Sequence, residues 1–307
     1  MTKKLLPQNV YIGRFAPSPT GKLHFGSLVS AVASYVDAKA NRGKWLVRME
    51  DLDPPREEPG AADSIIRSLE AHYLLWDDTL LYQSQRLDAY EDALSGLHQY
   101  LYPCSCKRQR IIELGGTYDG YCLKHPPNLS LTTATRIKIT GLPQAQRQSV
   151  EHFNDLLLGP QENPLSTTGD FILRRKDQLF AYQLAVAIDD DFQHISHVIR
   201  GRDLLDSTSR QRYILALIGA QLPEYGHTPL ALGQDGDKLS KQTKAPEIQN
   251  NQASENLIKA LDFLGHPPPK HDLADKNCST LLEWAIAHWD RDKIPKHSSV
   301  APKLSSA

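Results

Sequence analysis

The sequence predicts an α/β fold built on a parallel sheet, and three neighbouring segments carry this prediction. β-Branched and aromatic residues at 10–15 and 44–50 are typical of strands, and between them small and apolar residues recur at helical spacing over 23–41. A strand, a helix and a second strand within about forty residues form a βαβ unit, whose two strands run parallel. At about 150 residues per domain, the 307 residues suggest one large domain or two smaller ones.

The later elements are less regular and end in helices. Two amphipathic helices come next, and residues 102–127 then lose all periodicity. A polar, glycine-rich loop at 233–243 precedes the last helices, and the polar stretch 296–307 is expected to fray. The expected helices are 60–73, 86–100, 206–219, 255–264 and 281–289, and the expected strands are 134–139, 171–175 and 228–232.

Composition and charge exclude several classes of protein. Hydrophobic residues make up 40% of the chain, so a sizeable core can form and global disorder is excluded. The 35 Lys and Arg against 36 Asp and Glu give a net charge of −1, so any nucleic-acid contact must use a local basic face. No apolar run approaches the ~18 residues of a membrane helix, and Pro7, Gln8 and Asn9 exclude a secretory signal. We therefore expect a cytoplasmic protein that does not enter a membrane.

The loop between the first strand and the first helix has the chemistry of a phosphate site. Residues 17–27 read PSPTGKLHFGS and lie where the carboxyl end of a parallel strand meets a helix N-terminus. Gly21 and Gly26 allow a ligand close to the backbone, and His24 could bond a phosphate oxygen. The alternative is that His24 only caps the helix.

A second basic motif follows about two hundred residues later. Residues 238–242 read KLSKQ, and Lys238 and Lys241 could hold a triphosphate as point charges. Such a pentapeptide is more commonly a solvated surface loop, so its weight comes from the loop at 17–27.

Together these motifs resemble those of class I aminoacyl-tRNA synthetases. The family's HIGH motif corresponds to HFGS at 24–27, and its KMSKS motif corresponds to KLSKQ at 238–242. RFAPSPTG at 14–21 and RMEDLD at 48–53 resemble the glutamyl branch, and the likeness runs from about residue 10 to 243. Two departures are Ser27 in place of the last His and Gln242 in place of the last Ser.

The resemblance implies a Rossmann-type catalytic domain that uses ATP with Mg²⁺ and L-glutamate. A site for glutamate needs guanidinium groups for two carboxylates and an acid for the ammonium. By resemblance, Arg14 and Arg200 hold the carboxylates, Glu50 takes the ammonium, and Ser18 and Tyr182 contact the substrate. Arg200 favours glutamate over glutamine, because an amide would leave a buried guanidinium unpaired. His24 and Lys241 would be catalytic. The implied ATP-binding residues are Pro17, Gly21, His24, Gly26, Ser27, Lys238 and Lys241.

Within this class, the chain is most similar to the glutamyl-Q tRNA(Asp) synthetase family. Only 307 − 241 = 66 residues follow Lys241, too few for the anticodon domain of a standard glutamyl enzyme. Val186 stands where that enzyme has Asn, so we expect glutamate to bind more weakly by ~1 kcal/mol. The family activates glutamate and esterifies queuosine in the anticodon loop of tRNA(Asp). Charging of tRNA(Glu), a non-tRNA acceptor and a non-catalytic RNA-binding paralogue remain alternatives.

Three cysteines in a short irregular segment predict a metal site. Cys104, Cys106 and Cys122 are soft ligands suited to zinc, which takes four in a tetrahedron. The resemblance implies Tyr118 as the fourth ligand of one structural Zn²⁺, whereas ligand statistics favour His125, with Asp119 a further competitor. The remaining Cys278 is expected to be an unreactive thiol.

The predicted organisation has four parts, and we expect a monomer. The parts are two halves of the catalytic domain, an inserted zinc-bearing acceptor-type subdomain between them, and a small helical region that resembles a stem-contact region. In chain order they are residues 1–100 (first catalytic half), 101–180 (insertion), 181–244 (second half, with the KMSKS-like loop) and 245–307 (helical region).

Overall fold

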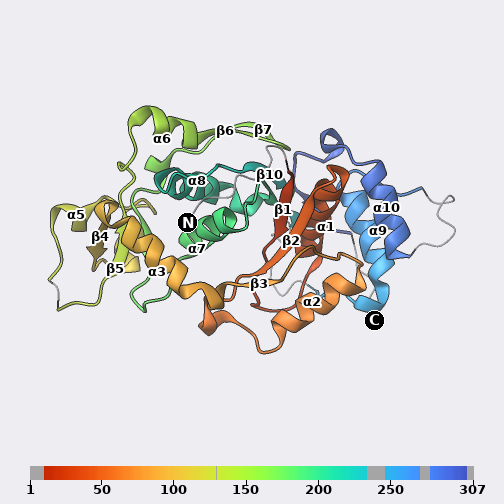
Figure 1. The fold of residues 1–307 in the computed structure, drawn as a ribbon, viewed down its shortest axis with the longest axis horizontal. Helices are drawn as coiled ribbons and strands as arrows, with labels where there is room; N and C mark the ends of the chain where they lie inside the picture. The colour runs from red at the N-terminus through yellow and green to blue at the C-terminus, as the bar shows by residue number, and fades with distance from the viewer. Residues whose placement is uncertain (1–9, 129, 234–245, 270–276, 303–307) are drawn as a thin grey trace.

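The computed structural model describes residues 10–128, 130–233, 246–269 and 277–302. Lys238 and Lys241 therefore lie outside the described residues. In Figure 1 the parallel sheet occupies the middle of the molecule, with β4, β5 and α5 at one end and α9 and α10 at the other.

A parallel sheet forms the centre, as predicted. Strands β1 (Ile12–Phe15), β2 (Lys44–Met49) and β3 (Leu81–Tyr82) are parallel neighbours, and Ile12 pairs with Lys44. A second group contains β9 (His197–Gly201), β10 (Glu224–Thr228) and β6 (His152–Asp155), all parallel, and β7 (Gly159–Glu162) closes it as an antiparallel edge. The groups meet at β1 and β9, where the N–H of Ser196 donates to the Ile12 carbonyl at 3.0 Å. Across the sheet the strands follow the order β3-β2-β1-β9-β10-β6-β7, so the connections from β1 and from β9 lead to opposite edges. Open α/β sheets bind ligands at such a position.

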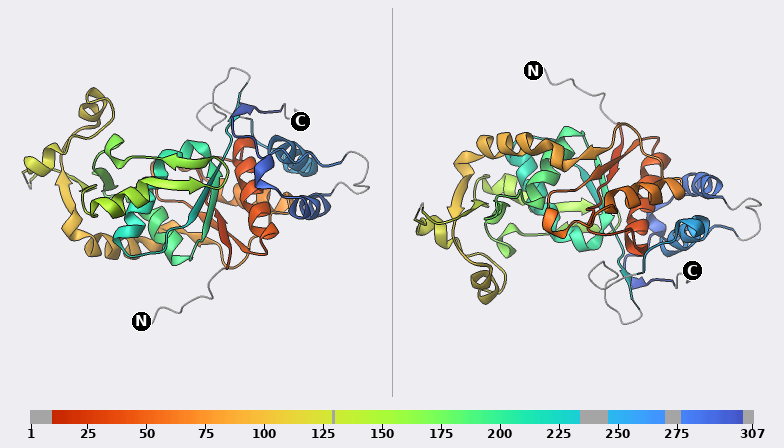
Figure 2. Two further views of the ribbon diagram at one scale, coloured as in Figure 1. Left: turned by 90° about the horizontal axis from the view of Figure 1, so that it is seen from above. Right: turned by 90° about the horizontal axis from the view of Figure 1, so that it is seen from below.

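The helices cover the sheet and the ends of the molecule. Helix α1 is buried on nearly every side, because it lies between the sheet and the pair α9 and α10 (Figure 2). The longer helices are α1 (Phe25–Ala40), α2 (Ala61–Ala71), α3 (Leu87–Gly96), α7 (Tyr182–Phe192), α8 (Thr208–Leu217), α9 (Ala253–Phe263) and α10 (Cys278–Ala287). The shorter ones are α4 (Arg108–Glu113), α5 (Tyr121–Lys124) and α6 (Gln144–Glu151).

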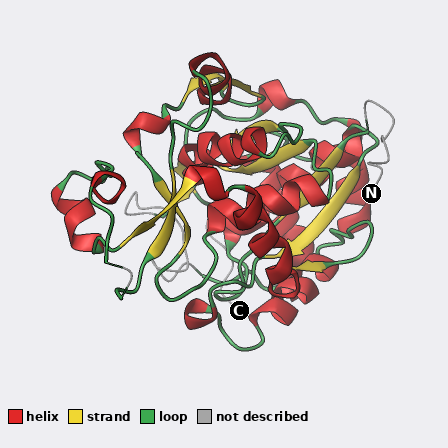
Figure 3. Cartoon of the chain, turned by 60° about the vertical axis from the view of Figure 1, so that its left-hand side comes forward, coloured by secondary structure: helices red, strands yellow, loops and turns green. Residues whose placement is uncertain are grey.

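A small antiparallel sheet stands apart from the parallel one (Figure 3). Its strands are β4 (Leu101–Cys104), β5 (Ala134–Ile137) and β8 (Phe171–Arg174), in the order β4-β5-β8. The cysteine-bearing segment is attached to it. The predicted insertion 101–180 thus contains this sheet, but it also contains β6 and β7, which return to the parallel sheet.

Two sequence predictions differ from the structure. The single strand expected at 228–232 is wrong: β10 ends at Thr228, and β11 (Ala231–Leu232) pairs instead with β12 (Ser299–Val300) inside the stretch expected to fray. Pro229 separates β10 from β11, because proline has no N–H for the ladder. Helices α4, α5, α6 and α7 and strands β3, β4, β6, β7 and β9 were not predicted as elements.

One buried carboxylate joins the C-terminal region to α1. Asp37 is fully buried and accepts from Arg291 Nε at 2.7 Å, from Arg291 Nη2 at 2.9 Å and from Trp289 Nε1 at 2.8 Å. Tyr11 Oη donates to the same carboxylate. This cluster fixes residues after α10 to the first strand and helix, so the C-terminal region is an integral part of the packing. None of the helices in the described parts of the chain combines the length and the apolar character needed to cross a bilayer.

Candidate active site

The carboxyl ends of the parallel strands bring the predicted glutamate-binding residues together. Arg14 lies in β1, Glu50 directly follows β2, Arg200 lies in β9 and Tyr182 begins α7. Burial raises the pKa of the Tyr182 phenol, the Glu50 carboxylate raises it further, and Arg200 and Arg14 lower it. These four side chains, far apart in sequence, therefore share one electrostatic environment.

A buried carboxylate that the sequence analysis missed holds two arginines beside Glu50. Asp190 in α7 accepts from Arg48 Nη1 at 2.8 Å and from Arg14 Nε at 3.4 Å. Arg48 also approaches Glu50 Oε1, with an Nη2–Oε1 distance of 3.5 Å, and donates to Gln193 at 2.9 Å. Arg14, Arg48 and Asp190 are almost fully buried, so their charges must be satisfied within this cluster.

The Glu50 carboxyl has a pKa close to neutral pH. Burial raises the pKa of this carboxyl to about 7, although the positive charges of Arg48 and Arg14 oppose the rise. A cation placed against Glu50 would favour the ionised form. The site is therefore suited to receive an ammonium group.

Arg200 is buried in a different kind of environment. Its Nε donates to His227 Nε2 at 3.1 Å, its Nη1 to Gln211 Oε1 at 2.7 Å, and its Nη2 to Thr208 Oγ1 at 2.9 Å and the Leu204 carbonyl at 3.1 Å. Among the described residues no carboxylate lies within ion-pairing distance of it. Gln211, Thr208 and His227 were not singled out from the sequence, because a lone polar residue in a helix or strand carries no distinguishing pattern.

The predicted phosphate loop leads into α1 as expected. Pro17 accepts from the Glu50 N–H at 2.9 Å, which ties the loop to the end of β2, and Gly21 has a φ of 133°, which side chains disfavour. His24 is the N-cap of α1, and its Nδ1 accepts from the Ser27 N–H at 3.3 Å, so it does cap the helix, and its role towards phosphate stays a prediction. Ser18 lies in the loop after β1, and Gly26 and Ser27 lie in the first turn of α1; all three are half-buried.

The chain returns to this loop just after the KMSKS-like segment. Glu247 forms an isolated bridge with His24, and the Ile248 N–H donates to the Leu23 carbonyl at 3.1 Å. Lys22 Nζ lies 2.7 Å from Glu247 Oε2. Residues 246–248 therefore run beside the phosphate loop, although the lysines of the motif are outside the described residues.

The three clustered cysteines converge on one point together with a tyrosine. Their Sγ atoms all lie within 4.8 Å of one another, and Cys106 Sγ is 3.4 Å from Cys122 Sγ. Tyr118 Oη is 3.6 Å from Cys104 Sγ and 3.9 Å from Cys106 Sγ. Burial tends to raise the pKa of Cys122, but hydrogen bonds from Tyr118 and Cys106 outweigh it and lower the pKa, whereas burial raises the pKa of Cys106. A thiolate at neutral pH is the form that binds a metal.

The side chains of the two competing candidates, His125 and Asp119, have partners away from the cysteine sulfur atoms. His125 is exposed, its Nδ1 is 3.2 Å from the Tyr121 carbonyl, and its ring stacks on Tyr121. Asp119 pairs with Arg110. Of the candidates for a fourth ligand, Tyr118 alone reaches the sulfur atoms.

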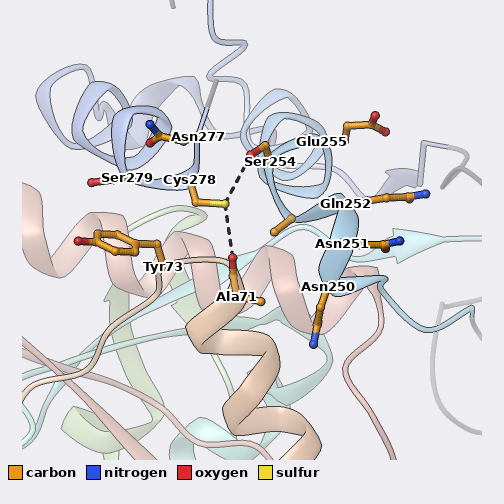
Figure 4. A pocket seen from close by; sticks show the side chains of 11 residues that line it. Ala71, Tyr73, Asn250, Asn251, Gln252, Ser254, Glu255, Asn277, Cys278 and Ser279 are labelled. Atoms are coloured by element: carbon orange, nitrogen blue, oxygen red, sulfur yellow. Dashed lines mark hydrogen bonds between the residues drawn. The ribbon is translucent and has the colours of Figure 1, made fainter. Parts of the chain in front are cut away.

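Cys278 lies in an open pocket among α9, α10 and the end of α2 (Figure 4). Its Sγ is 3.6 Å from both Ser254 Oγ and the Ala71 carbonyl, and burial raises the pKa of this thiol. A half-buried thiol with a raised pKa is a poor nucleophile, in agreement with the expectation from sequence.

Comparison with known proteins agrees with this arrangement. Residues 11–272 match the family model of the class I tRNA synthetases (E and Q), catalytic domain. The chain is 46% identical over 299 residues to a glutamyl-Q tRNA(Asp) synthetase of Serratia proteamaculans (strain 568), covering 96% of each chain. It is also 46% identical over 305 residues to the protein of that name from Salmonella typhi, covering 97% of this chain and 98% of the relative.

Solved structures share the fold at lower identity. A glutamate tRNA ligase from Elizabethkingia meningosepticum CCUG26117, in complex with its amino acid, superposes with a TM-score of 0.74 at 22% identity, covering 96% of this chain and 67% of that one. The glutamate-tRNA synthetase of Elizabethkingia anophelis gives 0.74 at 23% identity, covering 95% and 68%. The chain therefore belongs to the class I tRNA synthetases of the glutamyl and glutaminyl type and, within them, to the family of the glutamyl-Q tRNA(Asp) synthetases.

Proposed function

We propose that this ligase activates L-glutamate with ATP to glutamyl-adenylate and transfers the glutamyl group to queuosine of tRNA(Asp). The charge of the buried cluster is the observation that carries the choice of amino acid. Asp190 and ionised Glu50 balance the charges of Arg14 and Arg48, whereas Arg200 has no carboxylate within ion-pairing distance among the described residues. Glutamate carries two carboxylates and one ammonium, a net charge of −1, whereas glutamine is neutral. The side-chain carboxylate of glutamate would pair with Arg200, whereas the neutral amide of glutamine would leave that buried guanidinium without an anion.

The roles of the side chains follow from this balance. Arg200 takes the side-chain carboxylate, Glu50 takes the α-ammonium, and Arg14, Ser18 and Tyr182 complete the contacts to the amino acid. The α-carboxylate is already a nucleophile, so activation needs orientation and charge stabilisation and no strong base.

In the first step the α-carboxylate oxygen attacks the α-phosphorus of ATP, and the bond to the departing pyrophosphate breaks. Pro17, Gly21, Gly26 and Ser27 would form the backbone cradle for the nucleotide, and Mg²⁺ accompanies ATP as part of the substrate. His24 and the N-terminus of α1 stabilise the developing charge. Lys238 and Lys241 would hold the phosphates, in a segment that lies outside the described residues.

In the second step a hydroxyl of the queuosine cyclopentenediol attacks the acyl carbon, and AMP leaves. The choice of acceptor rests on the relatives, whose name specifies tRNA(Asp). In this proposal the anticodon loop enters the site of a monomeric enzyme. The catalytic domain is formed by 1–100 and 181–244 together with β6 and β7, is interrupted by the rest of 101–180, and is followed by the stem-contact-like region 245–307.

The cysteine cluster fits one structural Zn²⁺. Three sulfur atoms and the Tyr118 oxygen supply the four ligands that a closed tetrahedral site needs, so Cys104, Cys106, Tyr118 and Cys122 would hold it. The ion would cross-link the segment around α4 and α5 to β4. A closed site has no position for a catalytic water.

Labelled glutamate tests the function directly. The protein is incubated with ATP and, in parallel, with tRNA(Asp) bearing queuosine, tRNA(Asp) bearing guanosine at the same position, and tRNA(Glu). We expect label only on the first, in the anticodon fragment after nuclease digestion. Label on the 3′ end of tRNA(Glu) would indicate ordinary charging, and adenylate formation without any labelled tRNA would indicate a different acceptor. Absence of glutamate-dependent pyrophosphate exchange in every arm would indicate a non-catalytic paralogue.

A further inference from the structure

Arg200 differs from the other buried arginines of the site in the charge of its partners. Arg14 and Arg48 both donate to the carboxylate of Asp190. Arg200 is 4% exposed, and its four acceptors are an imidazole, an amide, a hydroxyl and a carbonyl. A guanidinium has five N–H groups, so one N–H of Arg200 has no acceptor among the described residues. These hydrogen bonds fix the orientation of the guanidinium group, but its neutral acceptors do not cancel the positive charge.

A buried cation held by neutral groups retains its full attraction for an anion. A carboxylate in the place of any of these acceptors would neutralise the guanidinium and repel the side chain of glutamate. The neutral state of His227 is therefore essential to the arrangement, because an imidazolium could not accept from Arg200 Nε.

Asp155 determines which nitrogen of His227 carries the proton. The two residues are fully buried, and Asp155 Oδ2 lies 2.5 Å from His227 Nδ1. A carboxylate can only accept, so Nδ1 carries the hydrogen and Nε2 presents its lone pair to Arg200. Burial lowers the pKa of His227 to about 4 despite this carboxylate, which keeps the ring neutral.

We propose that Asp155 and His227 are a positioning pair that holds Arg200 as an oriented, uncompensated cation and so selects an amino acid with an anionic side chain over its neutral amide. The proposal rests on the proposed function, because Arg200 is taken there as the contact for the side-chain carboxylate. Asp155 at the end of β6 and His227 in β10 reach Arg200 in β9 across three adjacent strands. Neither residue touches the substrate.

A pair that merely braces the strands makes different predictions from a positioning pair. If the pair only stabilised the packing of the strands, its loss would lower the free energy of unfolding and weaken the binding of all ligands alike. Loss of the positioning pair weakens glutamate binding, leaves ATP binding unchanged and reduces the preference for glutamate over glutamine.

Two substitutions at position 227 separate these possibilities. His227→Leu removes the acceptor, whereas His227→Gln retains an oxygen that can accept from Arg200. We expect His227→Leu to raise the Kd for glutamate about tenfold, the effect of one hydrogen bond to a charged group, and His227→Gln to stay within about threefold. Calorimetric titration with glutamate, glutamine and ATP gives the three Kd values, and His152→Gln, an exposed histidine at the start of β6, is the matched control. A Kd for glutamate that is the same in His227→Leu as in the unaltered chain would overturn the proposal.

Asp155→Asn tests the tautomer. Asp155 Oδ1 accepts three backbone N–H groups, those of His227, Leu157 and Leu158, at 3.1, 3.0 and 2.9 Å. The amide oxygen would keep this place, so the NH₂ group would face Nδ1 and force the hydrogen onto Nε2, towards Arg200. Nitrogen-15 NMR of labelled histidine should show the exchange of tautomer, together with a Kd for glutamate raised about tenfold or more. An unchanged tautomer, or an exchanged tautomer with unchanged Kd, would contradict the proposal.

The experiments distinguish an error in the proposed role of Asp155 and His227 from an error in the proposed function. Amino-acid binding is measured without tRNA, whereas the proposed function depends on transfer to queuosine. A chain that binds glutamate through Arg200 but transfers it to none of the tRNAs would refute only the proposed acceptor. A chain that transfers glutamate normally, with the position-227 variants unchanged in Kd, would refute only the pair.

Discussion

Glutamate binding should release a proton from Glu50. This carboxyl is buried, and burial raises its pKa to about 7 against the opposing charges of Arg48 and Arg14. In the proposed complex the substrate ammonium lies against the carboxylate, which favours the ionised form. Binding is therefore strongest above the pKa, where no proton has to be removed, and weakens as the pH falls below it.

The size of the effect follows from the pKa of the empty site. With a pKa of about 7, roughly one molecule in eleven is ionised at about pH 6 and roughly ten in eleven at about pH 8. The apparent affinity for glutamate should therefore rise about tenfold between these two values, or about 1.4 kcal/mol, and binding near pH 7 should release about half a proton.

Isothermal titration calorimetry measures both quantities. The apparent Kd is determined across this pH range, and the observed enthalpy near pH 7 is compared in buffers of different ionisation enthalpy. Glu50→Gln is the control, because it cannot titrate: it should bind glutamate weakly and with no dependence on pH. Equal affinities at the two ends of the range, with an enthalpy independent of buffer, would refute the assignment of Glu50 to the ammonium.

Three further expectations concern packing, the metal site and the substrate. Asp37→Asn should lower the free energy of unfolding by about 3 kcal/mol, because a buried carboxylate holds the C-terminal region, whereas Asp78→Asn, at an exposed ion pair, should change it by less than about 1 kcal/mol; urea unfolding measures both. Tyr118→Phe should reduce the zinc content of protein purified against a weak chelator, and His125→Ala should leave it unchanged, as elemental analysis can determine. Val186→Asn should lower the KM for glutamate about fivefold, since position 186 lies one helical turn after the start of α7; an unchanged KM would disprove this.

The first part of the fold could be predicted because its signals are local. The strand at 10–15, the helix at 23–41 and the strand at 44–50 correspond to β1, α1 and β2, and each shows its periodicity within a few turns or pleats. Helix α7 was missed for an equally local reason. Its apolar residues are followed by three consecutive aspartates, two of which are buried because arginines from elsewhere reach them.

Only some residues of the candidate site were named from the sequence, and those that were missed share one cause. Arg14, Glu50, Tyr182 and Arg200 came from a resemblance to a family; the structure places the first, second and fourth at neighbouring strand ends and Tyr182 at the start of α7. Asp190 is 176 positions from Arg14, and no local pattern indicates that the two will meet. Only the strand order, with β9 beside β1, determines this contact.

The same limit applies to the electrostatic difference between the two predicted carboxylate-binding arginines. From the sequence, the resemblance gives Arg14 and Arg200 the same role, and no neighbouring residue distinguishes their partners. In the structure Arg14 shares a carboxylate with Arg48, whereas Arg200 is surrounded by neutral acceptors. A guanidinium already paired with a carboxylate gains little from a second anion, whereas an unpaired buried one gains a great deal. Selection of the anionic side chain therefore depends on the partners of Arg200 more than on the presence of arginine itself, and those partners come from strands that only the fold brings together.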